Sequence, residues 1–440
     1  MGEVKKEKHV NRWTRVIGAI LIQMALGSIY AWSVFNKPLA ADLGEPSKSL
    51  QVLGIFATSL AAFGIFVSVG GRLQDKSGPK NIAMLSGVVY AVGYLISSQF
   101  TDSIALMYVG YAVLGAGVGI GYSCALSCCV KWFPDKRGLV SGLAVAGFGA
   151  GTFVFAQVGQ FIIDSGSSQT AGLSSAYLYL GLIFLAMVLV GAQLLCDPPS
   201  GFCPSGWTPP KSGAGSTAKK QFTPKEMVRT KSFIFLWIMF VLSATCGLMM
   251  IGNVSNLGQN FEDIYADATP GFEPASQNVM VTAQVATITG VLAIFNGAGR
   301  IVWGMVSDRI GRTKTMKLMF LTQAIILFAA AAFVMSKPID ENTVFIGVTA
   351  IVSAVGFCFG GNFALFPPTT TEYFGTKYLG TNYGVVFTSY AVGGVLGGLM
   401  PGIIKGGFEW VFIATAVGSL VAFAIAWITK APAVAEEAKS

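Results

Sequence analysis

The sequence is poor in the side chains that carry acid–base and metal chemistry. It has a single histidine, His9, and only 11% of its residues are charged, against about 25% in soluble domains. Among its seven cysteines, Cys196 and Cys203 have neither a Cys-x-x-Cys spacing nor a nearby histidine. These shortages argue against an enzyme, and they predict no metal site and no other cofactor.

Apolar residues and glycine are abundant instead. Hydrophobic residues make up 53% of the 440 positions, and 54 more are glycine. The remaining five cysteines lie inside apolar segments, where a thiol behaves as a small hydrophobe, so no disulfide framework is expected. The composition is typical of a membrane protein with many spans. The net charge of +8 would suggest nucleic-acid binding in a soluble protein, but the positions of the charges indicate membrane orientation instead.

Twelve apolar runs are long enough to cross a hydrocarbon core of about 30 Å, which takes about 20 helical residues. The first run follows a basic tail, "KKEKHVNRWTR", but it is too long for the apolar part of a signal peptide. The sequence therefore predicts an all-α membrane protein with twelve transmembrane helices. The expected spans are 14–36, 50–70, 81–99, 104–130, 138–163, 174–196, 232–256, 280–305, 318–336, 343–366, 381–404 and 408–429.

Lysine and arginine are concentrated on one side of these spans. The two tails and every second loop hold 24 of the 29 basic residues. Because basic loops stay in the cytoplasm, both termini are expected there. The long loop 257–279, on the other side, is acidic. The connector 197–231 is rich in Pro, Gly and Ser and is expected to be a linker. It divides the chain into two six-helix halves, 1–196 and 232–440.

The two halves repeat a loop motif. "GRLQDKSGPK" (71–80) follows the second span, and "GMVSDRIGRTK" (304–314) follows the eighth. Both read Gly-x-x-x-Asp-[Lys/Arg]-x-Gly, and they place Asp75–Lys76 and Asp308–Arg309 at matching positions. "WFPDKRGLVSGL" (132–143) also aligns with "YFGTKYLGTNYGV" (373–385), with one inserted residue. Parallel halves of this kind are typical of major facilitator transporters.

These motifs carry a family resemblance over nearly the whole chain. The paired loops resemble the signature of the major facilitator superfamily. "NRWTRVIGAILIQMALGSIYAWSVFN", "KWFPDKRGLVSGLAVAGFGAG" and "LFPPTTTEYFG…NYGVVF" are similar to the oxalate–formate antiporter family. Within it, the first segment is most similar to a bacterial pyruvate and lactate transporter branch. The resemblance implies alternating access, and it implies that Asp75, Lys76, Asp308 and Arg309 gate the cytoplasmic side. The alternative is that these loops only hold solvated orientation charges.

Arg300 is the residue that fits its surroundings least. Away from the span ends, no other Asp, Glu, Lys, Arg or His lies in any span. It lies eight residues before Asp308, or roughly 12 Å along a helix. A charge at such depth costs about 2.5–3.5 kcal/mol by insertion scales. Because no carboxylate in the spans offsets it, we expect an anionic ligand. The guanidinium fork matches a carboxylate, and Asn296 lies on the same helical face. The alternative is an arginine held by backbone carbonyls and hydroxyls.

Aromatic residues complete the predicted site. Tyr30, Tyr122 and Tyr390 fall near the middle of their spans, where a hydroxyl needs a partner. The resemblance places an oxalate-binding lysine of the exchanger at Tyr390 and aromatic residues of its binding cage at four phenylalanines. One fixed charge instead of two fits a monocarboxylate with an apolar end. Interface anchoring and lipid contact are the alternatives for these rings. The phenylalanines expected to contact substrate are Phe148, Phe357, Phe359, Phe363 and Phe387.

The sequence thus predicts a secondary transporter of a small monocarboxylate, of the pyruvate or lactate type, in the inner cell membrane. Its partners are the organic anion, the lipid bilayer and, by resemblance only, protons. Oxalate–formate exchange is the first alternative. A membrane receptor or scaffold that binds an anion without moving it is the alternative from another class.

Overall fold

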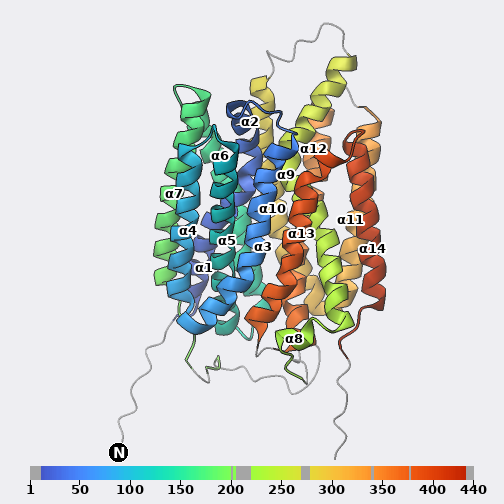
Figure 1. The fold of residues 1–440 in the computed structure, drawn as a ribbon. Coiled ribbons are helices and arrows are strands. Elements are labelled where there is room, and N and C mark those ends of the chain that lie inside the picture. The colour runs from blue at the N-terminus through green and yellow to red at the C-terminus, as the bar shows by residue number, and fades with distance from the viewer. Residues whose placement is uncertain are drawn as a thin grey trace, which may run out of the picture.

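The computed structural model describes residues 11–199, 202–204, 220–268, 278–337, 341–375 and 378–432. Helices run side by side through this part of the chain (Figure 1). In chain order they are α1 (Trp13–Gly27), the 3₁₀ helix η1 (Ser28–Ala31), α2 (Trp32–Asp42), α3 (Leu50–Ser77), α4 (Pro79–Gln99), α5 (Ile104–Trp132), α6 (Arg137–Asp164), α7 (Gln169–Gln193), α8 (Pro224–Met227), α9 (Lys231–Ala268), α10 (Asn278–Ile310), α11 (Arg312–Met335), α12 (Glu341–Phe374), α13 (Leu379–Ile403) and α14 (Phe408–Ile428).

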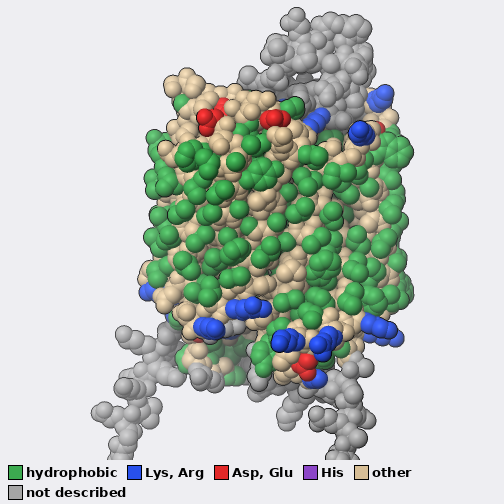
Figure 2. All heavy atoms as spheres, in the orientation of Figure 1, with side chains coloured by type: hydrophobic (Ala, Val, Ile, Leu, Met, Phe, Trp, Pro, Cys, Tyr) green, Lys and Arg blue, Asp and Glu red, His purple; other side chains and the backbone are tan. Residues whose placement is uncertain are grey.

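Twelve spans of the described chain are long and apolar enough to cross a membrane. The first combines α1, η1 and α2, and each of the others is a single helix, so the predicted all-α fold of twelve spans is confirmed. Apolar side chains form a belt across the face of the bundle seen in Figure 2, and Lys and Arg gather at its lower end. We call this end, where α1 begins and α14 ends, the basic face.

The repeated loop motif forms the same turn in both halves. Gly78 separates α3 from α4 and has φ +77°, and Gly311 separates α10 from α11 and has φ +91°. Only glycine adopts this left-handed region without strain, because it has no Cβ. The last glycine of each motif therefore has a backbone reason for its position, and each predicted loop is reduced to a tight helix–helix turn.

Two predicted loops are helical where a loop was expected. α12 continues through Pro367 and Pro368 to Phe374, so the prediction of a loop from 367 is wrong. The hydroxyls of Thr369 and Thr370 donate to carbonyls one turn earlier, which supports the backbone around the two prolines. Likewise, α9 continues through the first part of the predicted loop 257–279 to Ala268, with non-helical dihedral angles at Asn253.

Small residues let helices of the two predicted halves pack closely. A Cβ on Gly64 of α3 would lie 2.6 Å from the Cβ of Ala391 on α13. Near the basic end of the same pair, a Cβ on Gly71 would lie 3.2 Å from the carbonyl oxygen of Gly380. α3 and α13 therefore touch along much of their length (Figure 1). α6 and α10 form a second close pair across the halves, and these two contacts enclose the site described below.

The end of the predicted linker is ordered against the second half, and residues 205–219 of it lie outside the described residues. α8 begins at a capping box in which Thr223 and Glu226 bind each other's backbone N–H groups. These contacts and Lys220 lower the pKa of Glu226 to about 2. The N–H of Phe222 donates to the carbonyl of Phe374, 2.9 Å away, and its own carbonyl accepts from Asn382. The linker thus ends as a segment fastened to α12 and α13.

Candidate functional site

Arg300 lies on α10 in the middle of the bundle, at the contact between α6 and α10. Its side chain is only 1% exposed, although it carries a permanent charge. Nη1 donates to the carbonyl oxygen of Val145 on α6, 2.5 Å away. The guanidinium carbon lies 4.4 Å from the centre of the Phe363 ring and 5.7 Å from that of Phe148. No ion pair joins Arg300 to a carboxylate in the described chain, so its charge is held by dipoles and aromatic faces.

Close helix packing positions this arginine. A Cβ on Gly299 would lie 2.0 Å from the carbonyl oxygen of Phe357, and one on Gly360 would lie 2.1 Å from that of Asn296. α10 and α12 therefore approach to backbone contact in the helical turn that precedes Arg300. Asn296 itself is 2% exposed, and neither amide atom has a partner among the described residues. Buried amides are normally hydrogen-bonded, so this side chain has unused capacity one turn from the guanidinium.

The three predicted tyrosines surround the same space. The hydroxyl oxygens of Tyr30 on η1 and Tyr390 on α13 are 2.5 Å apart. Tyr122 on α5 is 1% exposed, and its hydroxyl has no partner in the described part of the chain. All three lie within electrostatic range of Arg300. The 3₁₀ turn of η1 interrupts the first span at Ser28–Ala31, which places Tyr30 at this centre.

Four of the five predicted phenylalanines join this cluster. Phe148 packs edge-on against Tyr30 with 5.0 Å between ring centroids, and Phe387 stacks on Tyr390 at 4.8 Å. Phe359 and Phe363 contact each other at 5.2 Å. Together with Arg300, Asn296 and the three tyrosines, these rings make up what we call the central cluster.

Phe357 is the predicted site residue that the structure places elsewhere. It lies two residues before Phe359, and a helix turns by about 200° over two residues at 3.6 residues per turn. Its ring packs on Trp303 at 5.8 Å, and it is partly exposed. The expectation that both rings line one site disregarded helical geometry.

Two residues of the cluster were missed by sequence reasoning. Phe63 on α3 lies 4.9 Å from Tyr390 and 5.4 Å from Tyr122 between ring centroids, so it closes the cluster on the α3 side. Tyr383 on α13 is buried, its hydroxyl has no partner in the described chain, and it lies within electrostatic range of Arg300. Tyr383 stands seven residues before Tyr390, two helical turns away, and this spacing was a usable signal.

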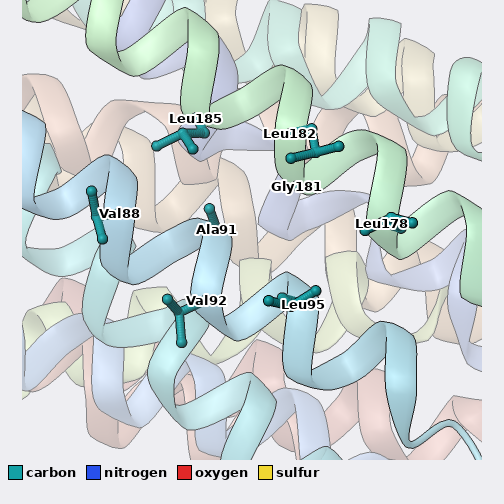
Figure 3. Close-up of a pocket in the computed structure, with 8 residues that line it drawn as sticks. All are labelled: Val88, Ala91, Val92, Leu95, Leu178, Gly181, Leu182 and Leu185. Atoms are coloured by element: carbon teal, nitrogen blue, oxygen red, sulfur yellow. The ribbon is translucent and has the colours of Figure 1, made fainter.

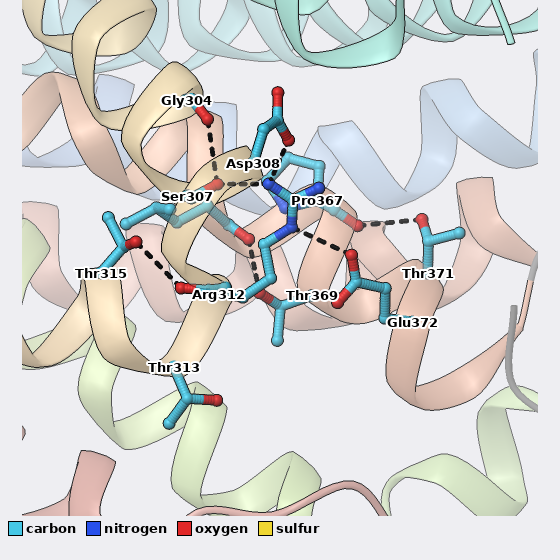
Figure 4. A network of polar contacts seen from close by, with 12 residues as sticks. Gly304, Ser307, Asp308, Arg312, Thr313, Thr315, Pro367, Thr369, Thr371 and Glu372 are labelled. Atoms are coloured by element: carbon cyan, nitrogen blue, oxygen red, sulfur yellow. Dashed lines mark hydrogen bonds and ion pairs between the residues drawn. The ribbon is translucent and has the colours of Figure 1, made fainter. Parts of the chain in front are cut away.

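Of the four predicted gating residues, Asp308 makes a described contact at the basic face, and its partner belongs to the same half. Arg312 at the start of α11 binds Asp308 at 2.7 Å and Glu372 of α12 at 3.0 Å, and it also contacts Ser307 (Figure 4). Arg312 and Glu372 were not predicted, although Arg312 follows Asp308 by four residues, the spacing of a helical ion pair. Lys76 and Arg309 are exposed at helix ends. The side chain of Asp75 lies outside the described residues.

An apolar groove between α4 and α7 is a different feature. Its lining residues are aliphatic apart from a glycine, and several are more than 40% exposed on the outside of the bundle. It has no polar side chain to orient an anion and belongs to the apolar belt (Figure 3). The groove is lined by Val88, Ala91, Val92, Leu95, Leu178, Gly181, Leu182 and Leu185.

In the described chain, twelve helical segments long and apolar enough to span a membrane enclose one buried arginine, as expected of a polytopic membrane carrier. The family model of the Major Facilitator Superfamily matches residues 16–398 and 275–440. The chain belongs to this superfamily of transporters, and it is therefore not an enzyme.

Known proteins agree with this assignment. The chain is 31% identical over 423 residues to the oxalate:formate antiporter of Oxalobacter formigenes, covering 94% of this chain and 91% of that protein. It is 24% identical to apicoplast pyruvate carrier 1 of Toxoplasma gondii, covering 88% and 83% of the two chains. The solved proton:xylose symporter XylE superposes with a TM-score of 0.64 at 13% identity over 95% of each chain, a likeness of fold alone. The predicted similarity to the oxalate–formate antiporter family is confirmed.

Proposed function

We propose that this protein is a secondary transporter of a small monocarboxylate, of the pyruvate or lactate type, that works by alternating access. The observation that carries the proposal is Arg300, which is 1% exposed and has no carboxylate partner in the described chain. Burying an ion is favourable only when another group compensates it. Without substrate, the Val145 carbonyl and the aromatic rings hold the charge, and a carboxylate that binds the guanidinium fork adds the opposite charge that they lack.

The neighbours of Arg300 suit a monoanion with a short apolar end. Asn296 and Tyr122 have unused hydrogen-bonding capacity beside it. Phe148, Phe363 and Phe387 offer ring faces to a methyl group or a carbonyl carbon. A second carboxylate would meet Tyr390, which is neutral, in a site of low dielectric, and that desolvation is costly. One positive charge therefore favours one negative charge.

Oxalate–formate exchange is the second candidate. It is favoured by the 31% identity to an oxalate:formate antiporter over most of both chains. An anion-binding receptor or scaffold that moves nothing is the candidate from another class. We place the protein in the inner cell membrane with the basic face, and so both termini, in the cytoplasm, because basic loops are retained there.

The deciding experiment combines binding and flux. Purified protein is heated with pyruvate, lactate, formate, acetate and oxalate, because a ligand of the folded state raises stability by RT ln(1 + [L]/Kd). Labelled pyruvate and oxalate uptake is then measured in proteoliposomes. Stabilisation and uptake with pyruvate or lactate support the proposal. Tighter binding of oxalate than of every monocarboxylate supports exchange of the oxalate type, and binding without uptake supports a receptor.

A further inference from the structure

The partner that Arg300 already has inside the chain bears on how the transporter completes its cycle. Nη1 of Arg300 on α10 donates to the carbonyl oxygen of Val145 on α6 at 2.5 Å. α6 belongs to the first predicted half and α10 to the second, so this hydrogen bond crosses the interface between them. An N–H⁺···O=C bond is charge-assisted and stronger than a neutral one.

Other groups of the chain support the same buried charge. The guanidinium carbon is 4.4 Å from the Phe363 ring centre, within the range of a cation–π contact, and this ring comes from α12. The ring of Phe148, on α6 like Val145, lies 5.7 Å away on the other half. The dipoles and rings that hold the cation therefore come from both halves, and they hold it at 1% exposure.

We propose that this contact makes the protein a carrier capable of net transport rather than an obligatory exchanger, an inference that rests on the proposed function. An exchanger of a single anion class is obligatory when its binding-site cation cannot be buried without the anion. Here a backbone carbonyl of the opposite half takes one of the places that a carboxylate oxygen would occupy. The halves can then close on Arg300 both with the carboxylate bound and after it has left.

The geometry of α6 and α10 determines whether Val145 reaches Arg300. A Cβ on Gly149, one helical turn after Val145, would lie 2.6 Å from the carbonyl oxygen of Ala293 on α10. A contact under 3 Å with backbone forces the helices apart. A Cβ on Gly297, in the same interface, would lie 3.8 Å from Ala146, an ordinary van der Waals distance. Gly149→Ala and Gly297→Ala are therefore a matched pair, of which only the first separates the two helices.

The experiment measures efflux of labelled pyruvate from proteoliposomes loaded with it, with the membrane potential clamped. Efflux into pyruvate-free buffer reports net transport, and efflux into buffer with unlabelled pyruvate reports exchange. For the natural sequence we expect the two rates to agree within about tenfold, since both the loaded and the unloaded carrier can reorient. Exchange without measurable net efflux would overturn the inference alone, whereas absence of both fluxes would overturn the proposed function.

The two glycine variants test whether the Val145 contact is the cause. Gly149→Ala should lower the ratio of net efflux to exchange by about threefold or more. The halves of the empty carrier depend on the Val145 carbonyl to close around Arg300, whereas in the loaded carrier the substrate carboxylate is present. Gly297→Ala should leave the ratio unchanged. If Gly149→Ala slows both fluxes in the same proportion, the α6–α10 contact is packing only and the inference fails. If this variant does not insert, the comparison of fluxes in the natural sequence still decides whether the carrier performs net transport.

Discussion

The hydroxyl oxygens of Tyr30 and Tyr390 lie 2.5 Å apart and join η1 of the first half to α13 of the second. Both side chains are at most 3% exposed, so each hydroxyl depends on the other for its hydrogen bond. The pair lies beside Phe63, Phe148 and Phe387, at the centre of the cluster around Arg300. A change at either tyrosine therefore alters the site and the contact between the halves together.

Replacing one tyrosine of this pair should destabilise the protein more than replacing both. Tyr390→Phe leaves the Tyr30 hydroxyl buried without its partner, which costs about 1–3 kcal/mol. The double variant Tyr30→Phe/Tyr390→Phe removes both hydroxyls and should recover much of that loss. Thermal unfolding of the purified variants measures both effects. If the double variant loses about twice as much stability as Tyr390→Phe alone, the two hydroxyls act independently.

A positive charge at Tyr390 should change the preferred anion. Tyr390→Lys offers a second cation beside Arg300, so the ratio of oxalate to pyruvate affinity should rise by tenfold or more, about the effect of one charge-assisted contact. Tyr390→Phe is the control, because it removes the hydroxyl without adding charge. Ligand-induced shifts in melting temperature give the ratio for all three proteins. If the ratio of oxalate to pyruvate affinity is unchanged in Tyr390→Lys, the number of positive charges in the site does not select the monocarboxylate.

Much of this fold follows from the sequence, and the central cluster follows only in part. Span length and the positions of basic residues are one-dimensional properties, so the twelve spans could be predicted. The motif loops were predicted too, but not the tight turns that they form at Gly78 and Gly311. Arg300 stood out because it is a charge in an apolar run. Phe63 could not be singled out in the same way. It is one of 32 phenylalanines, and only the approach of α3 to α13 brings it to Tyr390.

Arg300 variants should separate binding from folding. Arg300→Gln should weaken pyruvate binding by about 30-fold or more, the effect of losing 2–5 kcal/mol from a buried charged contact. Stability without added anion should not fall, because the variant no longer buries a charge. Arg300→Lys should also transport poorly, since an ammonium group lacks the planar fork. Uptake at the natural rate by either purified variant would exclude Arg300 from the binding site.

The loop carboxylates are expected to stabilise closure at the basic face. Asp308→Asn weakens one contact of Arg312 and leaves Glu372 as its partner, and Asp75→Asn changes the matching loop of the other half. Both variants should shift the population toward opening at that face. Ser68 on α3 packs against Gly384 of α13, so Ser68→Cys in a background without native cysteines reports the opening. Modification by a water-soluble thiol reagent should become faster in each variant, and equal rates in both would argue against gating.

The ion pair of Arg12 and Asp135 should make stability depend on pH at the basic face. The guanidinium binds both carboxylate oxygens, at 2.6 and 2.9 Å, and it lowers the pKa of Asp135. A carboxyl with a lowered folded-state pKa contributes stability above its unfolded pKa, about 3.9, and loses it as pH falls through the folded value.

At pH 7, Asp135→Asn should therefore have a free energy of unfolding lower than that of the natural protein by about 1 kcal/mol or less. The difference should shrink below pH 4 as the natural carboxyl becomes protonated. Asp102→Asn, at an exposed position, is the control for the removal of one carboxylate. A gap between Asp135→Asn and the natural protein that stays constant from pH 7 to about 3 would mean that the contact contributes by packing and not by charge.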